Sequence, residues 1–358
     1  MEILDEKNEK QWKDFISKQS CVPPQSTISW KNVISKTYKN CEPIYYINIK
    51  DKIVKTIFPF FLVKSKIFGN RLISQPFIDI GGPLGEFDKN FIIGVIENLK
   101  RKFEKDLKGI EIRINNFLSD YEKICECLLK EGFKEIPKKN QLILELENEE
   151  ILWNKFDRIT KKGIKKAKKS RLEIREIKDK KEITNFYKLY LNNMKHFGVP
   201  QNSLKFFLNL SKSEIFKGLN CYKERELVAS IIGLYTKDYI YIGFNVSKQE
   251  YLKYRANDLL YWEIIKWAIK KGIKYFDFGQ CEANAKEGTH AAGIYKFKKK
   301  WLGKLYNKTY FYYSLEKKSE DGSLIKENKK DKLIETWKKL PSSVIKILGP
   351  KICSQLAL

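Results

Sequence analysis

Residues 270–304, KKGIKYFDFGQCEANAKEGTHAAGIYKFKKKWLGK, limit the fold more than any other stretch of the chain. They contain a helix end at Gly272, an apolar strand at Lys274–Phe278, a turn-rich loop, and a segment rich in lysine and aromatic residues. A helix that leads into an apolar strand is typical of an α/β unit. From Gly288 to Leu315 there are six lysines and no acidic residue. Lysines interleaved with aromatic rings suit a polyanion that also presents flat bases, and a solvated helix face over core aromatics is the alternative.

The overall composition predicts a folded protein with two cores and a partner that carries phosphate. The chain has 358 residues, of which 42% are hydrophobic and 13% aromatic, so two domains are expected. Its 70 basic and 44 acidic residues give a net charge of +26. Such an excess favours nucleic acid, nucleotides or anionic lipid headgroups. A lysine-rich coding bias also contributes, so the positions of the charges carry more information than their sum.

Cysteine and histidine usage argues against a metal site. Seven cysteines are scattered without a C-x-x-C pair, and only two histidines are present. This pattern is typical of a reduced, cytoplasmic protein. The N-terminal MEILDEKNEK does not resemble a signal peptide, and no apolar run approaches the ~20 residues that a membrane span needs.

The predicted elements of the second half repeat the general arrangement of the first half, without a repeat in the sequence. The first half has a hairpin at 43–49 and 53–63, a glycine-proline loop at 76–83, helices at 88–105 and 121–131, and strands at 109–114 and 141–146. The second half has a strand at 172–177, helices at 182–196, 203–210 and 257–271, and strands at 220–226, 227–235, 239–246, 274–278 and 305–314. We therefore predict an α/β (α+β) protein with an internal duplication.

The predicted domains are residues 1–148 and 149–315, and the second contains a strand-loop-strand unit within 274–314. Residues 316–332 are charged and predict a linker. Residues 333–358 are amphipathic and predict a helix. This helix either packs on the body of the protein or lies on a membrane surface, and packing is favoured.

Residues 151–171 predict a single helix with a strongly basic surface. Between Trp153 and Arg171 there are nine cations and one anion, Asp157. Like charges spaced four residues apart destabilise a helix, so a polyanion partner explains them better than stability does. A lysine-rich proteome is the alternative explanation.

Common catalytic motifs are absent from the sequence. We find no G-x-S-x-G elbow, P-loop, G-x-G-x-x-G or H-E-x-x-H. A (Q/R)-x-x-G-x-(G/A) loop, which usually binds the pyrophosphate of acetyl-CoA in GNAT enzymes, is not found either; Gln280–Ala283 lacks its glycines. This absence weakens the interpretation of the chain as an acetyl-CoA enzyme.

The ordered motifs of the chain resemble those of the Fem-type aminoacyltransferases, in particular the broader FemAB-like group of GNAT-type acyltransferases. They cover nearly the whole chain: Leu72–Phe77 with Asp79 and Gly81–Pro83, Trp153–Lys169, Phe186–Leu210, Leu259–Glu263, Phe276–Gly279, Gly293–Trp301 and Trp337–Pro350. The resemblance implies two GNAT-like domains, each with a mixed, mostly antiparallel, twisted sheet flanked by helices. No inserted coiled-coil arm of the kind that some Fem enzymes carry is present.

The resemblance implies that Phe297 and Lys298 act at the aminoacyl end of the donor. An aminoacyl ester is already activated, so its amine acceptor needs positioning more than a nucleophilic side chain. A fixed cation where the tetrahedral oxyanion develops is the main requirement, and Lys298 is the candidate. Phe297 either stacks on a base or packs in the core. Asp277 either orients or deprotonates the acceptor amine, or caps the loop backbone.

The remaining candidates bind substrate or nucleic acid. They are Lys155, Arg158, Lys162, Lys165, Lys166, Lys169, His196, Ser203, Tyr295 and Lys299.

The resulting hypothesis is an aminoacyltransferase that forms an amide bond on a peptidoglycan-type precursor of the cell envelope. Aminoacyl-tRNA is the expected donor, the acceptor precursor is linked to a nucleotide or a lipid, and no cofactor or metal is expected. One alternative is an N-acyltransferase that uses acyl-CoA on an amino sugar or amino acid. Another is a non-catalytic GNAT relic that binds RNA or a membrane surface. We expect a cytoplasmic monomer, with contact at the cytoplasmic face of the membrane as an option.

Overall fold

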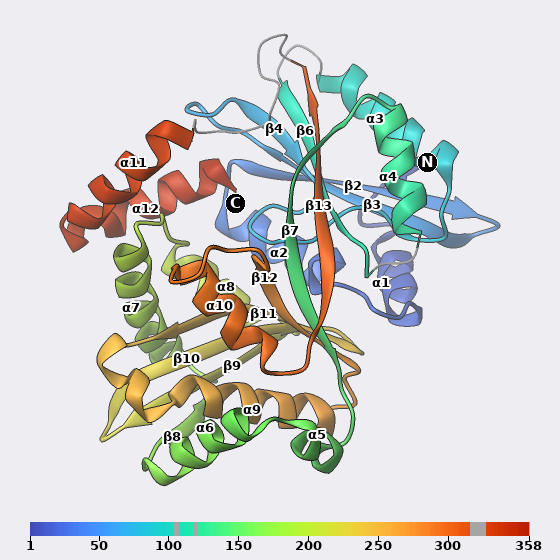
Figure 1. Ribbon diagram of the computed structural model, residues 1–358. Coiled ribbons are helices and arrows are strands. Elements are labelled where there is room, and N and C mark those ends of the chain that lie inside the picture. The colour runs from blue at the N-terminus through green and yellow to red at the C-terminus, as the bar shows by residue number, and fades with distance from the viewer. Residues whose placement is uncertain (104–106, 118–119, 316–326, 358) are drawn as a thin grey trace. The chain divides into compact units, whose positions relative to one another are not determined.

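The computed structural model describes residues 1–103, 107–117, 120–315 and 327–357 (Figure 1). The chain forms two compact units. Unit 1 comprises Met1–Lys139, Tyr306–Lys329 and Lys351–Leu358, and unit 2 comprises Asn140–Leu305 and Lys330–Pro350. These bounds differ from the predicted segments 1–148, 149–315 and 316–358. The difference arises because both units also contain segments from the C-terminal part of the chain.

Unit 1 is a mixed sheet with helices packed on it. Its strand order is β1-β2-β3-β4-β6-β13, β5 pairs with β3, and every pair is antiparallel except β4 with β6. The strands are β1 (Glu2–Ile3), β2 (Cys41–Lys50), β3 (Ile53–Val63), β4 (Asn70–Ile73), β5 (Leu84–Gly85), β6 (Leu107–Asn115) and β13 (Lys304–Ser314). The helices are α1 (Glu9–Lys18), a short 3-10 turn (Pro24–Ser26), α2 (Ile28–Thr37), α3 (Lys89–Phe103) and α4 (Tyr121–Lys130).

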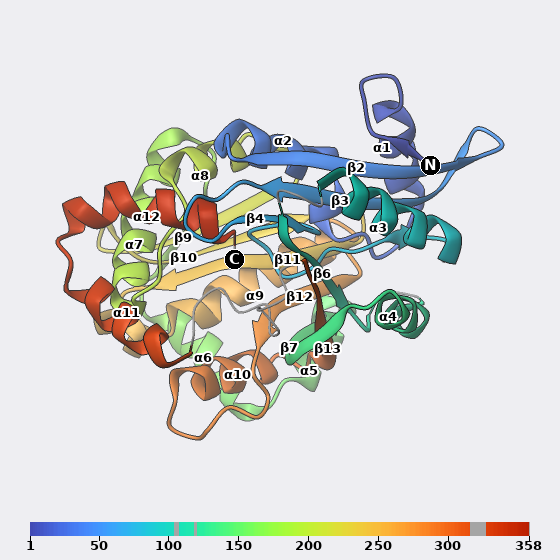
Figure 2. The ribbon, with the colours of Figure 1, turned by 90° about the horizontal axis from the view of Figure 1, so that it is seen from above.

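The long β2–β3 hairpin of unit 1 (Figures 1 and 2) is exposed near its ends, but its central residues are buried on both faces. Alternate residues Phe58 and Phe60 join the core formed with α3 and α4. Phe61 faces the other way and meets Tyr45, whose ring lies 5.1 Å from that of Trp12 on α1. Burial of both faces explains why β3 is almost continuously apolar.

In unit 2 the strand order is β7-β12-β11-β10-β9-β8. Only β11 and β12 are parallel. The strands are β7 (Lys134–Glu145), β8 (Glu173–Glu176), β9 (Phe216–Lys223), β10 (Glu226–Tyr235), β11 (Tyr239–Ser247) and β12 (Tyr275–Cys281). The helices are α5 (Glu149–Lys155), α6 (Arg158–Lys169), α7 (Lys180–Phe197), α8 (Leu204–Leu210), a 3-10 turn (Gln249–Tyr254), α9 (Ala256–Lys270), α10 (His290–Lys299), α11 (Glu327–Lys339) and α12 (Ser342–Leu356).

The strands of the two units follow the same plan. An antiparallel meander, β2-β3-β4 or β9-β10-β11, is followed by a helix, α3 or α9, and then by a parallel strand, β6 or β12. The strand that pairs with β6 is β13, and the strand that pairs with β12 is β7. The predicted mixed, mostly antiparallel arrangement of strands, flanked by helices, is confirmed in both units. For both β6 and β12 the pairing strand comes from the other half of the chain, an exchange of strands that no local sequence pattern marks. The predicted domain boundaries therefore differ from the observed ones.

Two segments predicted as continuous are divided. The helix predicted at 151–171 breaks into α5 and α6, because Phe156 is extended and buried and Asp157 accepts the Thr160 N–H at 2.6 Å as the cap of α6. The predicted strand-loop-strand unit also contains α10, whose first turn is capped by Thr289, which accepts the Ala292 N–H at 3.3 Å. The basic, aromatic segment is therefore a helix before β13.

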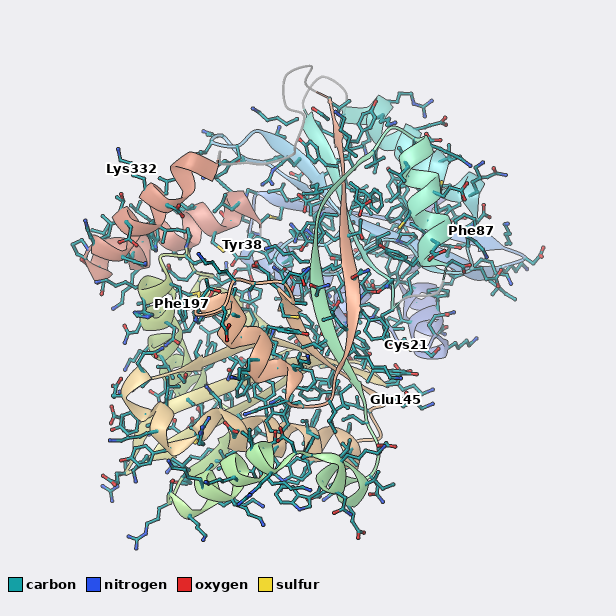
Figure 3. All side chains as sticks on the ribbon, in the orientation of Figure 1. Cys21, Tyr38, Phe87, Glu145, Phe197 and Lys332 are labelled. Carbon is teal, nitrogen blue, oxygen red and sulfur yellow. The ribbon has the colours of Figure 1, made fainter. Side chains whose placement is uncertain are left out.

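The tail also differs from its prediction. Of the predicted linker 316–332, residues 316–326 lie outside the described residues, and the rest starts α11, where Lys332 points into solvent (Figure 3). The amphipathic helix predicted at 333–358 is instead two helices divided before Pro341. The prediction that it packs on the protein is confirmed in unit 2, since Trp337 and Ile345 are buried and Gln201 donates to the Ile345 carbonyl at 2.8 Å.

Close packing of α6 on α9 predicts a large effect of Gly163→Ala. A Cβ at Gly163 would overlap Oδ1 of Asp258 on α9. We expect the substitution to cost about 1–3 kcal/mol of unfolding free energy through overpacking, despite the better helix propensity of alanine. Gly94→Ala on α3 is the matched control, because its Cβ would meet nothing within 4 Å. Chemical denaturation measures both, and equal stability of the two variants would contradict this packing.

Candidate active site

The candidate site lies where two parallel strands of unit 2 separate. The β11–β12 register runs from Tyr239 opposite Tyr275 to Tyr241 opposite Asp277 and ends there, although β11 continues to Ser247 and β12 to Cys281. Gly279 has a φ of +74°, and a Cβ there would lie 3.1 Å from the Ile242 carbonyl oxygen. Glycine therefore lets the β12 backbone turn away beside β11. We call this point the strand divergence.

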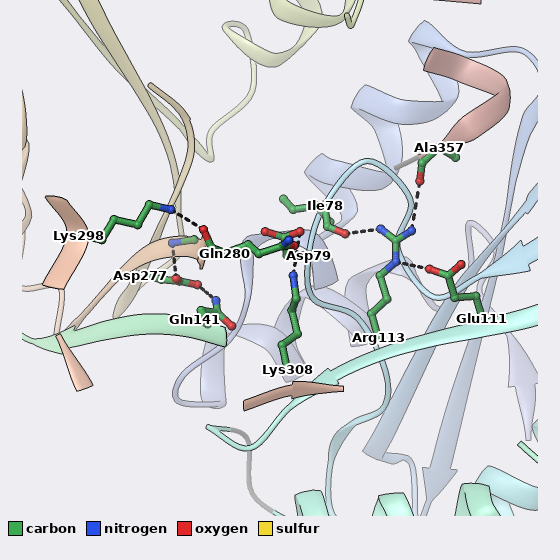
Figure 4. A network of polar contacts seen from close by, with 11 residues as sticks. Ile78, Asp79, Glu111, Arg113, Gln141, Asp277, Gln280, Lys298, Lys308 and Ala357 are labelled. Atoms are coloured by element: carbon green, nitrogen blue, oxygen red, sulfur yellow. Dashed lines mark hydrogen bonds and ion pairs between the residues drawn. The ribbon is translucent and has the colours of Figure 1, made fainter. Parts of the chain in front are cut away.

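Lys298 reaches the strand divergence from α10. Its Nζ donates to the Gln280 carbonyl at 2.8 Å, as Figure 4 shows, and its side chain is half-buried. The same Nζ would lie 3.6 Å from a Cβ built on Gly279. The structure thus holds an ammonium group beside the turn of β12 at Gly279 and Gln280, where a bound carbonyl group could be polarised.

Asp277 lies at the same point but is fully buried. Its Oδ2 accepts from the Gln141 amide and from the Tyr239 hydroxyl, the latter at 2.5 Å, and its Oδ1 accepts the Gly279 N–H at 2.7 Å (Figure 4). Because both oxygens accept hydrogen bonds inside the protein and the side chain is fully buried, the carboxyl group is poorly placed to take a proton from a substrate. The geometry favours the loop-capping role over the acid-base role.

The aromatic residues of α10 fasten it to the core of unit 2. The ring of Phe297 lies 5.2 Å from that of buried Tyr261, edge to face. Burial raises the pKa of the Tyr261 hydroxyl well above its usual range. Tyr295 is half-buried, and the ammonium of exposed Lys299 lies 5.6 Å from its ring centre. Phe297 therefore packs against the core, as the alternative to base stacking expects, and it is half-buried.

Lys300 is a site residue that sequence reasoning missed. Its Nζ lies 2.6 Å from Oδ1 of Asp258 in the first turn of α9 and 4.2 Å from the Phe297 ring centre. Burial lowers the pKa of the Lys300 ammonium, and the Asp258 carboxylate opposes this shift. The two residues lie 42 positions apart, so no local pattern could have found the pair.

The N-terminus of α9 borders a pocket of about 180 Å³. Arg255 precedes the helix with a φ of +61° and gives it no side-chain cap. Free N–H groups and the helix dipole at such an end favour anions. The pocket is lined by Val228, Ser247, Lys248, Tyr251, Leu252, Arg255, Ala256, Asn257, Asp258 and Phe297. It therefore extends from the strand end of β11 to α10.

The two candidates near α7 have different roles. Ser203 caps α8 by accepting the Phe206 N–H at 3.1 Å and lines none of the described pockets. His196 is exposed and lines a second pocket of about 230 Å³, which shares Ser247 and Lys248 with the first. Its neighbour Phe197 (Figure 3) lies 4.6 Å from the ring of His290 at the start of α10. Of the two, the structure brings only His196 near the candidate site.

The predicted basic surface is present on α6. Buried Thr160, Gly163, Ile164 and Ala167 form its inner face. The predicted cations Arg158, Lys162, Lys165, Lys166 and Lys169 are exposed. Lys155, on α5, forms an ion pair with Glu147. Thr160 donates its hydroxyl to the Lys300 carbonyl at 3.4 Å, so the start of α6 meets the end of the site helix α10.

Unit 1 has a buried polar cluster that the sequence did not indicate (Figure 4). Arg113 donates to Glu111 and to the Ile78 carbonyl, both at 2.6 Å, and Lys308 pairs with Asp79 at 3.1 Å. Burial alone would lower the pKa of the Arg113 guanidinium, but Glu111, Tyr310 and Asp79 together raise it. Asp79 belongs to the glycine-proline loop, and its partner Lys308 lies on β13. The Arg113–Ile78 hydrogen bond holds the loop to β6, and the Asp79–Lys308 ion pair holds it to β13.

Groups that would suit a metal are missing from the described parts of the chain, where no three His, Cys, Asp or Glu side chains gather as a metal site needs. Across the same residues, no helix has the length and apolarity required to cross a membrane.

Comparison with known proteins places this geometry in a recognised fold. Residues 154–299 match a family described as "Acetyltransferase (GNAT) domain". No curated protein sequence matches the chain.

Solved structures match over most of the chain. A crystal structure of FemX is 13% identical, covers 88% of this chain and 97% of its own, and superposes with a TM-score of 0.71. A tandem GNAT protein from the clavulanic acid biosynthesis pathway is 9% identical over 88% of this chain and 98% of its own, with a TM-score of 0.57. L-PGS from Bacillus licheniformis is 13% identical over 87% of this chain and 97% of its own, with a TM-score of 0.53. The chain therefore has a GNAT fold similar to that of FemX, as its resemblance to the FemAB-like group predicted.

Proposed function

We propose that this protein is an acyltransferase that forms an amide bond at the strand divergence, with aminoacyl-tRNA as donor and a cell-envelope precursor as acceptor. The observation that carries the proposal is the position of Lys298, whose ammonium is fixed on the Gln280 carbonyl beside Gly279. The match of residues 154–299 to a GNAT acetyltransferase domain supports acyl transfer. The resemblance to the FemAB-like aminoacyltransferases supports an aminoacyl donor and an envelope acceptor, and the chain has a fold similar to that of FemX.

The reaction needs a cation more than it needs a base. The acceptor amine attacks the ester carbonyl of the aminoacyl group, a C–N bond forms, and the carbonyl oxygen becomes negative. The Lys298 ammonium stabilises that oxygen, the ester C–O bond then breaks, and the proton lost by the amine ends on the leaving ribose oxygen. Asp277 acts as a positioning residue, because its hydrogen bond to the Gly279 N–H shapes the turn that Lys298 faces.

The exposed cations of α6 are proposed to bind the donor RNA. Replacing Lys162, Lys165, Lys166 and Lys169 by glutamine should weaken tRNA binding at least tenfold. It should also lower the slope of log affinity against log salt by roughly 0.7–0.9 for each phosphate that the variant no longer neutralises. Filter binding at several salt concentrations measures both effects.

A matched variant removes the same charge elsewhere, with glutamine at the exposed residues Lys180, Lys181, Lys205 and Lys212. It should retain the affinity and slope of the parent protein. Equal losses in the two variants would show that net charge, and not α6, attracts the RNA.

The pocket at the start of α9 favours a second candidate, an N-acyltransferase that uses acyl-CoA on an amino sugar or amino acid. Lys248 and Arg255 line it beside an uncapped helix N-terminus, which suits a diphosphate. Coenzyme A would then raise the melting temperature of the protein, and acetyl-CoA would support amide formation without RNA. A protein that neither transfers an acyl group nor binds coenzyme A would instead fit a non-catalytic relic that binds RNA or a membrane surface.

A further inference from the structure

Unit 1 has an open basic pocket that the proposed reaction does not use. It has a volume of about 930 Å³, and its lining contains four lysines, several amide and hydroxyl side chains, one isoleucine and no acidic residue. Lys39 follows α2, Lys64 and Lys66 follow β3, and Lys351 lies on α12. These residues are far apart in sequence, so the fold itself assembles the lysines around one opening.

The walls of this pocket are built from hydrogen-bonded polar groups. Asn40 donates its amide to the Lys64 carbonyl at 3.0 Å and to the Ser354 carbonyl at 2.9 Å. The Gln355 side-chain oxygen accepts from the Ser65 hydroxyl at 3.1 Å and from the Ile67 N–H at 3.3 Å. The turn after β3 and the end of α12 are therefore fastened together, which keeps their lysines close.

Three of the four lysines have no ion-pair partner among the described residues. Lys64 pairs with Glu42, and both side chains are half exposed. Lys39, Lys66 and Lys351 are exposed and form no ion pair with any described residue. A phosphate that entered the pocket would meet these cations without displacing a carboxylate, so the charge of the pocket complements an anionic headgroup.

A large apolar side chain stands at the rim. Ile67 is 62% exposed and follows Lys66 directly in the turn before β4. An exposed isoleucine side chain is unfavourable in water. Its transfer into the acyl region of a bilayer lowers the free energy of the bound state. Lysines that hold headgroups around an apolar tip are the combination by which peripheral proteins bind membranes. A soluble phosphate compound would leave Ile67 without a role.

We propose that this pocket docks the protein on an anionic membrane surface, with a phospholipid phosphate among Lys39, Lys66 and Lys351 and with Ile67 inserted below the headgroups. This inference is independent of the proposed acyl transfer. It concerns where the protein acts, and its variants leave the strand divergence unchanged.

The test is co-sedimentation of the full chain with vesicles of phosphatidylcholine alone or mixed with phosphatidylglycerol. The parent protein should bind the mixed vesicles and not the neutral ones. Replacing Lys39, Lys66 and Lys351 by glutamine should weaken binding about 100-fold, since each lysine near an anionic surface contributes about a factor of five. The control variant, with glutamine at the exposed residues Lys52, Lys205 and Lys212, removes the same charge and should change binding by less than about threefold.

A second pair of variants tests the insertion separately. Ile67→Asp should weaken vesicle binding by about tenfold or more, whereas Ile53→Asp, at a residue 59% exposed in the same unit, should not. Both are surface substitutions, and a thermal melt confirms that each variant folds.

Three outcomes would overturn the proposal. Equal losses in the two lysine variants would mean that net charge alone drives binding. An unchanged Ile67→Asp variant whose vesicle binding is displaced by millimolar inorganic phosphate would identify a free phosphate site instead of a membrane site. Loss of binding only in the α6 lysine variant would assign the membrane contact to α6. Transfer from charged tRNA to a soluble amine acceptor is measured in parallel, and its absence would reject the proposed function without touching this inference.

Discussion

Replacement of Lys298 by methionine is expected to lower the rate of amide transfer by about 100- to 1,000-fold, the loss typical when a fixed oxyanion-stabilising group is removed. The side chain is half-buried and gives up its hydrogen bond to the Gln280 carbonyl. Methionine keeps most of its volume, so the unfolding free energy should fall by only about 1 kcal/mol. Single-turnover transfer with bound donor measures the effect on chemistry apart from binding.

Lys296→Met is the control for this prediction. Lys296 lies on the same helix, is exposed, and carries the same charge. Its loss should leave the single-turnover rate within about twofold of the parent, as for surface substitutions in general. Equal rates for the Lys298 and Lys296 variants would remove Lys298 from the chemistry and leave it a structural role.

Replacement of Asp277 by alanine should destabilise the protein by about 3–5 kcal/mol, because each buried donor left unpaired costs about 1–3 kcal/mol. The affected donors are the Gln141 amide, the Tyr239 hydroxyl and the Gly279 N–H. Denaturant unfolding measures the loss. Asp277→Asn keeps an oxygen for the Gly279 N–H and should lose less stability than alanine. If Asp277 instead acted as a general base, Asp277→Asn would abolish transfer without lowering the stability of the protein.

Asp14→Ala supplies the reference for a surface carboxylate. Asp14 is exposed on α1, and its removal should change the unfolding free energy by less than about 0.5 kcal/mol. A similarly small change for Asp277→Ala would contradict the hydrogen-bond network around β12.

The sequence predicted most strands and helices because their hydrophobic spacing is strong. The hairpin of β2 and β3 and the amphipathic α9 were placed within a few residues of their observed bounds. The break at Phe156 was missed although Asp157 is a normal capping residue, because apolar residues on both sides of the break kept a helical spacing. Thr289 was likewise an available cap signal for α10. Glycines and lysines around it favoured a loop instead.

Sequence patterns did not predict contacts between residues that are far apart in the chain. The strand exchange depends on the pairing of β13 with β6, where Lys308 lies opposite Asn115. The Lys300–Asp258 pair and the Asp79–Lys308 pair arise from packing, and nothing within a window of local sequence marks them. Lys298 was found because a resemblance to a family supplied it. The chain alone would have presented it as one lysine among six.

One experiment directly tests whether aminoacyl-tRNA is the acyl donor. The purified protein is incubated with a pool of charged tRNA and with acceptor precursors carrying free amines, and the products are followed by mass spectrometry. The proposal predicts an amide product heavier by one amino-acid residue, which disappears when the RNA is digested beforehand and when Lys298 is replaced by methionine. A product heavier by an acetyl group, formed from acetyl-CoA without RNA, would contradict it.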